Sequence, residues 1–161
     1  MPDGVETAAG AVTGPVPVPE RVFRMMRVVS VEVVLPEQHP VLTLAEIEGG
    51  SRQLVFRVGM PEGTALAHSL AGTMAPRPLT HDLFTEVLER FAVDVAAVRL
   101  VGRFGATYLA ELDLMGSRGR QVVACRPTDG VALALRQRVP APILADDRLL
   151  STTGDVPGPV V

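Results

Sequence analysis

The sequence predicts an α+β fold with mainly antiparallel sheets and three helices. Segments rich in β-branched residues and segments with helical periodicity occur in blocks: three strands, two helices, three strands and one helix. Strands and helices grouped in this way are typical of α+β domains, whereas regular alternation indicates a parallel sheet. At 161 residues with 47% hydrophobic content, the chain is long enough for one domain with a substantial core.

A short repeat supports this organisation. Residues 62–67, EGTALA, return as residues 129–134, DGVALA, and each copy follows an apolar stretch. The spacing predicts one strand-turn-helix unit present twice. Each copy places a carboxylate, Glu62 or Asp129, in a first helical turn, where free N–H groups and the helix dipole favour negative charge. Both are candidate site residues, although the same placement serves helix stability alone.

The first half of the chain is expected to form three strands and a helix. Strands are predicted at 26–35, 41–47 and 53–58. A hairpin turn is expected at Gly49 and Gly50, and Pro61 and Gly72 suit the start and end of a helix over 61–71. The first two strands carry apolar residues on both faces, so we expect a homodimer that buries part of the sheet.

The second helix has the clearest signals. Thr80 suits the N-cap position, and Leu79 before it can pack against Phe84, which predicts a helix over 81–91. One apolar stripe runs along this helix, formed by Leu83, Phe84, Val87, Leu88 and Phe91.

The second half repeats the pattern of strands followed by a helix. Strands are predicted at 95–101, 107–114 and 121–125, the first two joined by a hairpin around 103–105. Thr128 is expected to cap a helix that continues to about residue 138, before Pro140 and Pro142. A short strand at 143–145 and a helical turn at 146–150 close the predicted domain.

The two ends of the chain have a different composition from the domain at 21–150. Residues 1–20 contain prolines spaced by two and are expected to form a flexible arm, and residues 151–161 a flexible tail. The sequence has no apolar run of membrane-spanning length and no basic-then-apolar start, so we expect a cytoplasmic protein. The single cysteine, Cys125, excludes an internal disulfide and a zinc site of several thiolates. Its place at a strand end is typical of an inert residue, although Arg126 and a helix start favour a lowered thiol pKa.

Basic residues are unevenly placed. The net charge of −3 argues against a chain that coats nucleic acid as a polycation. All fifteen basic residues are arginine, which suits phosphate binding and is equally typical of a GC-rich genome. Between 116 and 139 there are five arginines, at 118, 120, 126, 136 and 138, against the single acid Asp129.

Two segments resemble the signature motifs of a known family. Residues 76–83, PRPLTHDL, and 126–136, RPTDGVALALR, are similar to the two motifs of the bifunctional nuclease domain family. The similarity extends from about residue 27 to 150 and includes Val58-Gly59 followed by Glu62. Arg57 stands where the family usually has an aromatic residue, and Gly63 where it usually has alanine.

The resemblance implies a compact, oligomeric α+β domain that cleaves DNA and RNA. Phosphodiester hydrolysis needs an activated water and neutralised phosphoryl oxygens, often through a divalent metal such as Mg²⁺ or Mn²⁺. Within the matched segments, the candidate catalytic residues are Glu62, His81, Asp82 and Asp129, and the candidate phosphate ligands are Arg77 and Arg126. Each also has a structural interpretation, as a helix cap or an ion-pair partner. The alternative function is a non-catalytic regulatory or protein-interaction module of the same fold.

Overall fold

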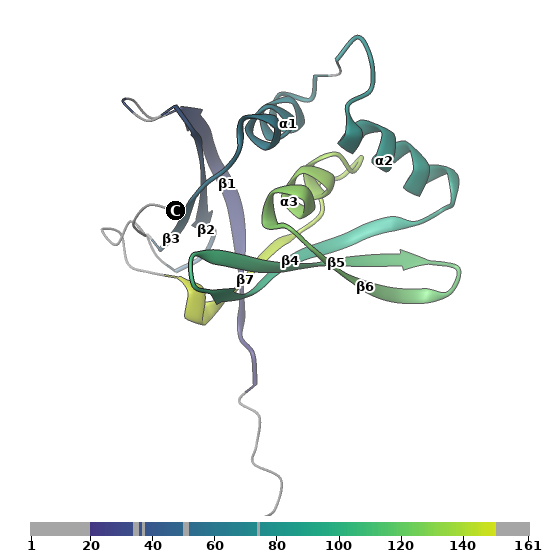
Figure 1. The fold of residues 1–161 in the computed structure, drawn as a ribbon. Helices are drawn as coiled ribbons and strands as arrows, with labels where there is room; N and C mark the ends of the chain where they lie inside the picture. The colour runs from purple at the N-terminus through teal and green to yellow at the C-terminus, as the bar shows by residue number, and fades with distance from the viewer. Residues whose placement is uncertain (1–19, 34–35, 37, 50–51, 74, 151–161) are drawn as a thin grey trace, which may run out of the picture.

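The computed structural model describes residues 20–33, 36, 38–49, 52–73 and 75–150. Within these residues one seven-stranded sheet carries three helices (Figure 1). The strands are β1 (Phe23–Val33), β2 (Pro40–Glu46), β3 (Gln53–Arg57), β4 (Asp94–Phe104), β5 (Thr107–Gly116), β6 (Gly119–Cys125) and β7 (Ile143–Asp146). The helices are α1 (Met60–Ala71), α2 (Thr80–Arg90) and α3 (Pro127–Leu135), followed by a 3-10 turn at Asp147–Leu149. The predicted α+β class is confirmed.

The sheet joins the two halves of the chain through its last strand. The strand order is β3-β2-β1-β7-β4-β5-β6, so β7 lies between β1 and β4. All neighbours pair antiparallel except β4 and β7, which are parallel. In Figure 1, β1 to β3 stand roughly upright while β4 to β6 lie across the view, which shows the strong twist between the two halves. The predicted separate sheets therefore form one mixed sheet.

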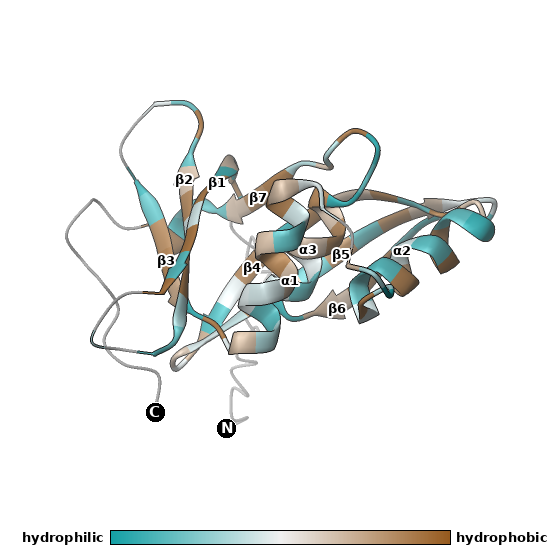
Figure 2. Cartoon of the chain, turned by 90° about the horizontal axis from the view of Figure 1, so that it is seen from above, coloured by the Kyte–Doolittle hydropathy of each residue, from teal (hydrophilic) through white to brown (hydrophobic). Residues whose placement is uncertain are grey.

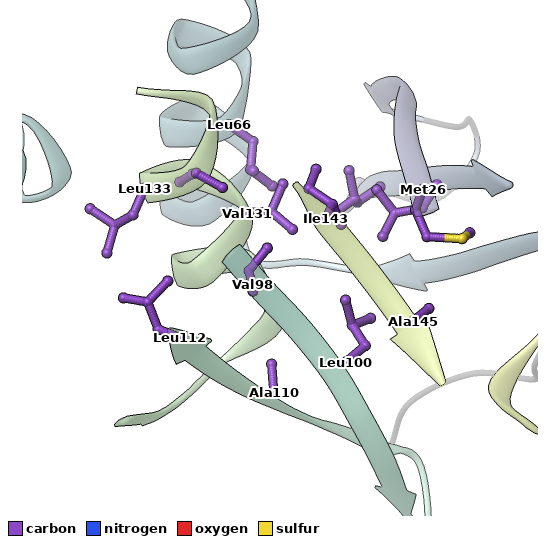
Figure 3. Packing of buried hydrophobic residues seen from close by; sticks show 14 of the residues in the cluster. Met26, Leu66, Val98, Leu100, Ala110, Leu112, Val131, Leu133, Ile143 and Ala145 are labelled. Carbon is purple, nitrogen blue, oxygen red and sulfur yellow. The ribbon is translucent and has the colours of Figure 1, made fainter. Parts of the chain in front are cut away.

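Helices α1 and α3 pack beside each other, with α1 on β1 and β2 and α3 on β4 and β5. Leu66 of α1 and Val131 of α3 are fully buried against Val98 of β4 and its neighbours (Figure 3). A methyl group on Gly130 would lie 2.5 Å from Cγ2 of Val98. Glycine at this place therefore allows α3 to approach β4 closely.

Three predicted helix ends are wrong, one in α2 and two in α3. Helix α2 begins at Thr80 with Leu79 as its N-cap, because the carboxylate of Asp82 accepts a hydrogen bond from the Leu79 backbone N–H at 2.8 Å. Helix α3 begins after Arg126, so Thr128 lies within the helix and forms no cap. The helix ends at Leu135 rather than near residue 138, since the Ala141 N–H already bonds to the Ala134 carbonyl.

The two copies of the hexapeptide begin α1 and α3, and each helix follows an edge strand, β3 or β6. That the two units are duplicates stays a prediction. The predicted arm, except its last residue, the predicted tail and Gly50 of the predicted turn lie outside the described residues. None of the described helices is long and apolar enough to cross a membrane.

Candidate functional site

The two acidic helix starts predicted from the sequence share one arginine. Arg126, the N-cap of α3, donates from Nε to Oδ2 of Asp129 at 2.7 Å and from Nη2 to Oδ1 at 3.1 Å. Its Nη1 donates to Oε1 of Glu62, in the first turn of α1, at 2.7 Å. The Glu62 and Asp129 side chains are mostly buried, while the Arg126 side chain is 63% exposed. Arg126 thus connects α1 and α3 and remains accessible to a ligand.

Helix α2 contributes His81 to the same site. Its Nε2 lies 3.0 Å from Oδ1 of Asp129, and both side chains are largely buried. Burial raises the pKa of Asp129, but hydrogen bonds from Arg126 and His81 outweigh it and hold the pKa below its ordinary value. Asp129 is therefore ionised at neutral pH, and His81 Nε2 carries the hydrogen of this bond. Nδ1 is then the ring nitrogen that can accept a proton.

These four residues line one pocket of about 650 Å³ between the helices and β5 and β6. Its polar part is formed by Glu62, His81, Arg126 and Asp129, together with Thr64 and Thr80. The remaining wall is mainly apolar and is formed by Pro61, Ala65, Leu79, Phe84, Leu112, Val123, Ala124, Cys125 and Leu133. The combination of a large apolar wall with a few convergent polar groups is typical of ligand sites.

Cys125 in this wall is not activated. Burial, followed by the charge of Asp129, raises the pKa of its thiol to about 11. A hydrogen bond from the Gly130 backbone N–H lowers the thiol pKa but does not overcome these effects. The thiol is protonated at neutral pH, in agreement with the inert role expected of this cysteine.

Asp82 faces a different hollow. Its Oδ1 accepts a hydrogen bond from Nε of Arg136 at 2.8 Å, and both side chains are about nine-tenths buried. Burial raises the pKa of Asp82, but the hydrogen bonds from Arg136 and Leu79 outweigh burial, so the pKa lies below its ordinary value. Asp82 and Arg136 line a separate pocket of about 780 Å³ with residues of α1 and α2. The structure therefore does not bring Asp82 into the pocket of Asp129.

Arg77 also does not contribute to the pocket of Glu62, His81, Arg126 and Asp129. It is exposed in the connection between α1 and α2, and it lines neither of these two pockets. It forms no ion pair or side-chain hydrogen bond with another described residue. Of the six predicted site residues, the pocket thus contains Glu62, His81, Arg126 and Asp129.

The arrangement does not form a ready metal site. In the part of the chain that the structure describes, no group of three or more His, Cys, Asp and Glu residues is placed to hold a metal ion. The carboxylates of Glu62 and Asp129 are both bonded to Arg126. A divalent cation would compete with the guanidinium for these oxygens. Arg126 and the carboxylates of Glu62 and Asp129 together carry a net charge of −1.

Sequence reasoning missed two features of the site. Phe84 was assigned to an apolar stripe of α2, but it lines the pocket and is 45% exposed. Other residues of that stripe, Leu83, Val87 and Phe91, are exposed as well. Figure 2 shows α2 at the periphery, with polar and apolar residues alternating around it. The strong amphipathicity of α2 could have indicated that Phe84 belongs to a binding surface.

The other residue that the sequence analysis did not identify is Arg136, because its pairing with Asp82 depends on how α2 and α3 pack.

Comparisons with known proteins agree with the motifs. A model of the bifunctional nuclease domain matches residues 42–156, which include all three helices and the four clustered residues. The chain is also similar to two uncharacterized proteins of Mycobacterium tuberculosis, one from strain CDC 1551 / Oshkosh and one from strain ATCC 25618 / H37Rv. Each is 38% identical over 129 residues, which cover 80% of this chain and 75% of the relative.

Proposed function

The chain belongs to the bifunctional nuclease domain family, and from this premise we propose that it is a nuclease that hydrolyses phosphodiester bonds in DNA and RNA. The proposal is based on the linked set of His81, Asp129 and Arg126 in the lining of one pocket. An oriented histidine beside an exposed arginine supplies a proton acceptor and a phosphate ligand together. We further propose that the protein acts in the cytoplasm.

Arg126 is suited to hold the scissile phosphate. A guanidinium has five N–H donors, and the bonds to Glu62 and Asp129 use three of them. Two donors on an exposed side chain remain for phosphoryl oxygens. Glu62 and Asp129 fix the plane of the guanidinium, so less side-chain freedom is lost when substrate binds.

His81 is suited to activate water. Asp129 accepts the Nε2 hydrogen and fixes the ring, and Nδ1 takes a proton from the attacking water. The water oxygen bonds to phosphorus while the bond to the leaving oxygen breaks, and that oxygen takes up a proton from solvent. Asp129 is therefore a positioning residue in this proposal, because it acts through His81 and Arg126.

A divalent cation, Mg²⁺ or Mn²⁺, is the cofactor that nuclease chemistry most often uses. Glu62 and Asp129 would have to release Arg126 to bind one, so the arrangement described here does not fit a preformed metal site. The cleavage assay with Mg²⁺, Mn²⁺ or chelator measures whether activity depends on such a metal.

To test this function, purified protein is incubated with single-stranded DNA, duplex DNA or RNA, each in the presence of Mg²⁺, Mn²⁺ or a chelator, and cleavage is measured. Asp129→Asn and Arg126→Ala are compared with wild type, and Arg90→Ala serves as the matched control. Arg90 is an exposed arginine of α2 whose partner is Glu86. We expect cleavage by wild type and Arg90→Ala, and loss in both site variants with unchanged circular dichroism. Cleavage that is absent, or equal in all four proteins, would exclude the nuclease function.

The alternative function, a regulatory or protein-interaction module, is favoured by a different observation. The exposed stripe of Leu83, Phe84, Val87 and Phe91 on α2 is a large apolar surface for a single helix. Such a surface is typical of a helix that binds a protein partner. Absent cleavage in the assay above, with retained folding, would favour this function.

We also propose that the protein is a homo-oligomer, with a dimer as the first expectation. Strand β2, expected to contribute to the interface, is largely buried within the subunit. Strand β1 still exposes Met25, Val29 and Val33, which supports an interface at that part of the sheet. Light scattering at micromolar concentration tests this proposal, and a monomeric mass would contradict it.

A further inference from the structure

The pocket of the candidate site has a chemical division that phosphate binding alone does not explain. The lining combines the charged group of Arg126 and its two carboxylates with five apolar residues, Leu79, Phe84, Leu112, Val123 and Leu133, which we call the apolar wall. Phosphate needs only the charged group. The apolar wall indicates that a flat, weakly polar group enters beside the phosphate.

We infer that the apolar wall receives one unpaired nucleobase, stacked on Phe84, and that the substrate is therefore single-stranded DNA or RNA. This inference rests on the proposed function, because the chemistry assigned to Arg126 and His81 places a phosphodiester at the pocket. In a polynucleotide the group covalently nearest to each phosphate, beyond the sugar, is a base. Phe84 is the one phenylalanine in the lining, which holds no tyrosine or tryptophan, and an aromatic face binds any base by stacking.

The size and the polar groups of the pocket fit this occupant. Its volume of about 650 Å³ lies within the range of pockets that hold small molecules, which is ~300–1,000 Å³. The hydroxyls of Thr64 and Thr80 lie in the same lining, where they can bond to the polar edge of a base. The Thr64 hydroxyl donates to the Met60 carbonyl at 2.9 Å, so it is left to accept a hydrogen bond, whereas the Thr80 hydroxyl can donate or accept. Because the Thr80 hydroxyl can rotate to suit either kind of edge group, the pocket is expected to tolerate all bases, as broad specificity requires.

A second hollow supports a path for the strand. Arg126 and Glu62 also line a second pocket of about 240 Å³, together with Phe56, Arg57, Thr107, Tyr108 and Thr128 among other residues. The Arg126–Glu62 pair thus lines both hollows. A single strand crossing this pair can place a phosphate on Arg126 and neighbouring nucleotides on either side. The two N–H donors of Arg126 that its carboxylate partners leave free can bond to the phosphate of that strand.

A duplex does not fit the same arrangement. Its bases are paired and stacked, so filling the apolar wall would require flipping one base out at a cost of a few kcal/mol. A second copy of this chain is the competing occupant, since Phe84 is continuous with the exposed stripe of α2. The spare donors of Arg126 in the pocket lining favour a nucleic acid, and the experiment below separates the two.

The experiment measures binding without cleavage. Fluorescence anisotropy of a labelled single-stranded DNA 12-mer, the matching duplex and a single-stranded RNA is recorded in chelator at one fixed salt concentration. Any cleavage in these samples is followed on gels. Phe84→Ala is compared with Phe91→Ala, a phenylalanine of the same helical stripe that is 77% exposed and lies outside the pocket lining. Phe84→Tyr keeps the aromatic face and controls for misfolding of the alanine variant.

We expect wild type to bind the single strands at least tenfold more tightly than the duplex. Phe84→Ala should weaken single-strand binding about 5- to 150-fold, the range given by ~1–3 kcal/mol per stacked base. Phe91→Ala and Phe84→Tyr should remain within about threefold of wild type, a difference below ~0.7 kcal/mol. Equal binding by Phe84→Ala and Phe91→Ala, or equal affinity for duplex and single strand, would overturn the inference.

Two further results separate this inference from the proposed function. If cleavage is lost in Asp129→Asn but is unaffected by Phe84→Ala on every substrate, the nuclease function stands and the base pocket is wrong. If no substrate is cleaved but Phe84-dependent single-strand binding persists, the base pocket stands and the hydrolytic function is wrong. A change of oligomeric mass in Phe84→Ala with unchanged nucleic-acid binding would assign the apolar wall to a second copy.

Discussion

Asp82 and Arg136 form an ion pair between α2 and α3, with 2.8 Å from Nε to Oδ1 and side chains that are only 11% and 8% exposed. Asp82 also accepts the Leu79 N–H at the start of α2, and Arg136 Nη1 donates to the Ala65 carbonyl of α1. The pair therefore connects all three helices. Within the described residues, Nη2 of Arg136 is the one buried side-chain polar atom without a hydrogen bond.

The first prediction concerns the stability of this pair. Asp82→Ala leaves the buried Arg136 charge without its carboxylate and removes the bond to the Leu79 N–H, so it should lower the free energy of unfolding by about 3–5 kcal/mol. Glu86→Ala, which breaks the exposed pair with Arg90 on the same helix, should cost less than about 1 kcal/mol. Urea titrations of both variants measure the difference. Equal, small effects would show that Asp82 has no structural role.

The second prediction concerns the contact of α3 with β4. A methyl group on Gly130 would lie 2.5 Å from Val98 Cγ2 and 3.1 Å from Cys125 Sγ. Gly130→Ala should therefore destabilise the protein by about 1–3 kcal/mol, although the higher helix propensity of alanine offsets up to ~1 kcal/mol. In Gly102→Ala the added methyl would meet only Leu109 Cδ1 at 3.9 Å, so that variant should stay within ~0.5 kcal/mol of wild type. Thermal unfolding of the two variants tests this contact.

The sequence predicted the helices and strands because hydrophobic periodicity and capping residues depend only on residues that are close together in the chain. The sequence placed Glu62 and Asp129 in the first turns of two helices, as the structure has them. It could not predict that both would bond to Arg126, since that convergence depends on the packing of α1 beside α3. The order of the sheet was also inaccessible, because β7 lies between two strands that are distant from it in the sequence.

The assignment of Asp82 illustrates the same limit. His81 and Asp82 are adjacent in the sequence and were both candidates for one site. On the first turn of α2 their side chains point in different directions, so His81 bonds to Asp129 and Asp82 bonds to Arg136. A motif of eight residues identifies a family, but the three-dimensional partner of each polar residue decides what that residue can do.

The third prediction concerns acid stability. The folded-state pKa of Asp129 is lowered, so its contribution to stability is fully present above the unfolded pKa of ~3.9 and is lost as the pH falls through the folded value. The difference in unfolding free energy between wild type and Asp129→Asn should therefore shrink as the pH falls below ~3.9. Urea titrations at several pH values measure it. A difference that stays constant down to pH 2 would contradict the ion-pair role of Asp129.

The fourth prediction concerns Cys125. Because burial and the Asp129 charge raise the pKa of its thiol to about 11, alkylation by iodoacetamide at pH 8 should be much slower than that of a free cysteine peptide. The rate should increase to that of the peptide when the protein is unfolded in urea. Mass spectrometry of timed samples measures both rates. Alkylation of the folded protein at the peptide rate would show that the thiol is accessible and activated.

The last prediction concerns the link between His81 and Asp129. If His81 is the proton acceptor and Asp129 positions it, His81→Ala should lower kcat by about 10²–10⁴, the usual contribution of general acid-base catalysis. Asp129→Asn should lower kcat because it weakens the bond that fixes the ring and the grip on Arg126. Since Asp129 acts in part through His81, the loss in the double variant should be smaller than the product of the two single losses, and the excess over His81→Ala alone measures the effect on Arg126.

The matched control is His68→Ala. His68 lies on α1, is hydrogen-bonded to Thr73, and lines the other large pocket. Single-turnover cleavage of a labelled oligonucleotide by all four variants, each checked for folding by circular dichroism, gives the comparison. His68→Ala should retain the wild-type rate. Losses that multiply in the double variant would show that His81 and Asp129 act independently, and an equal loss in His68→Ala would show that the effect of removing His81 is not specific to this site.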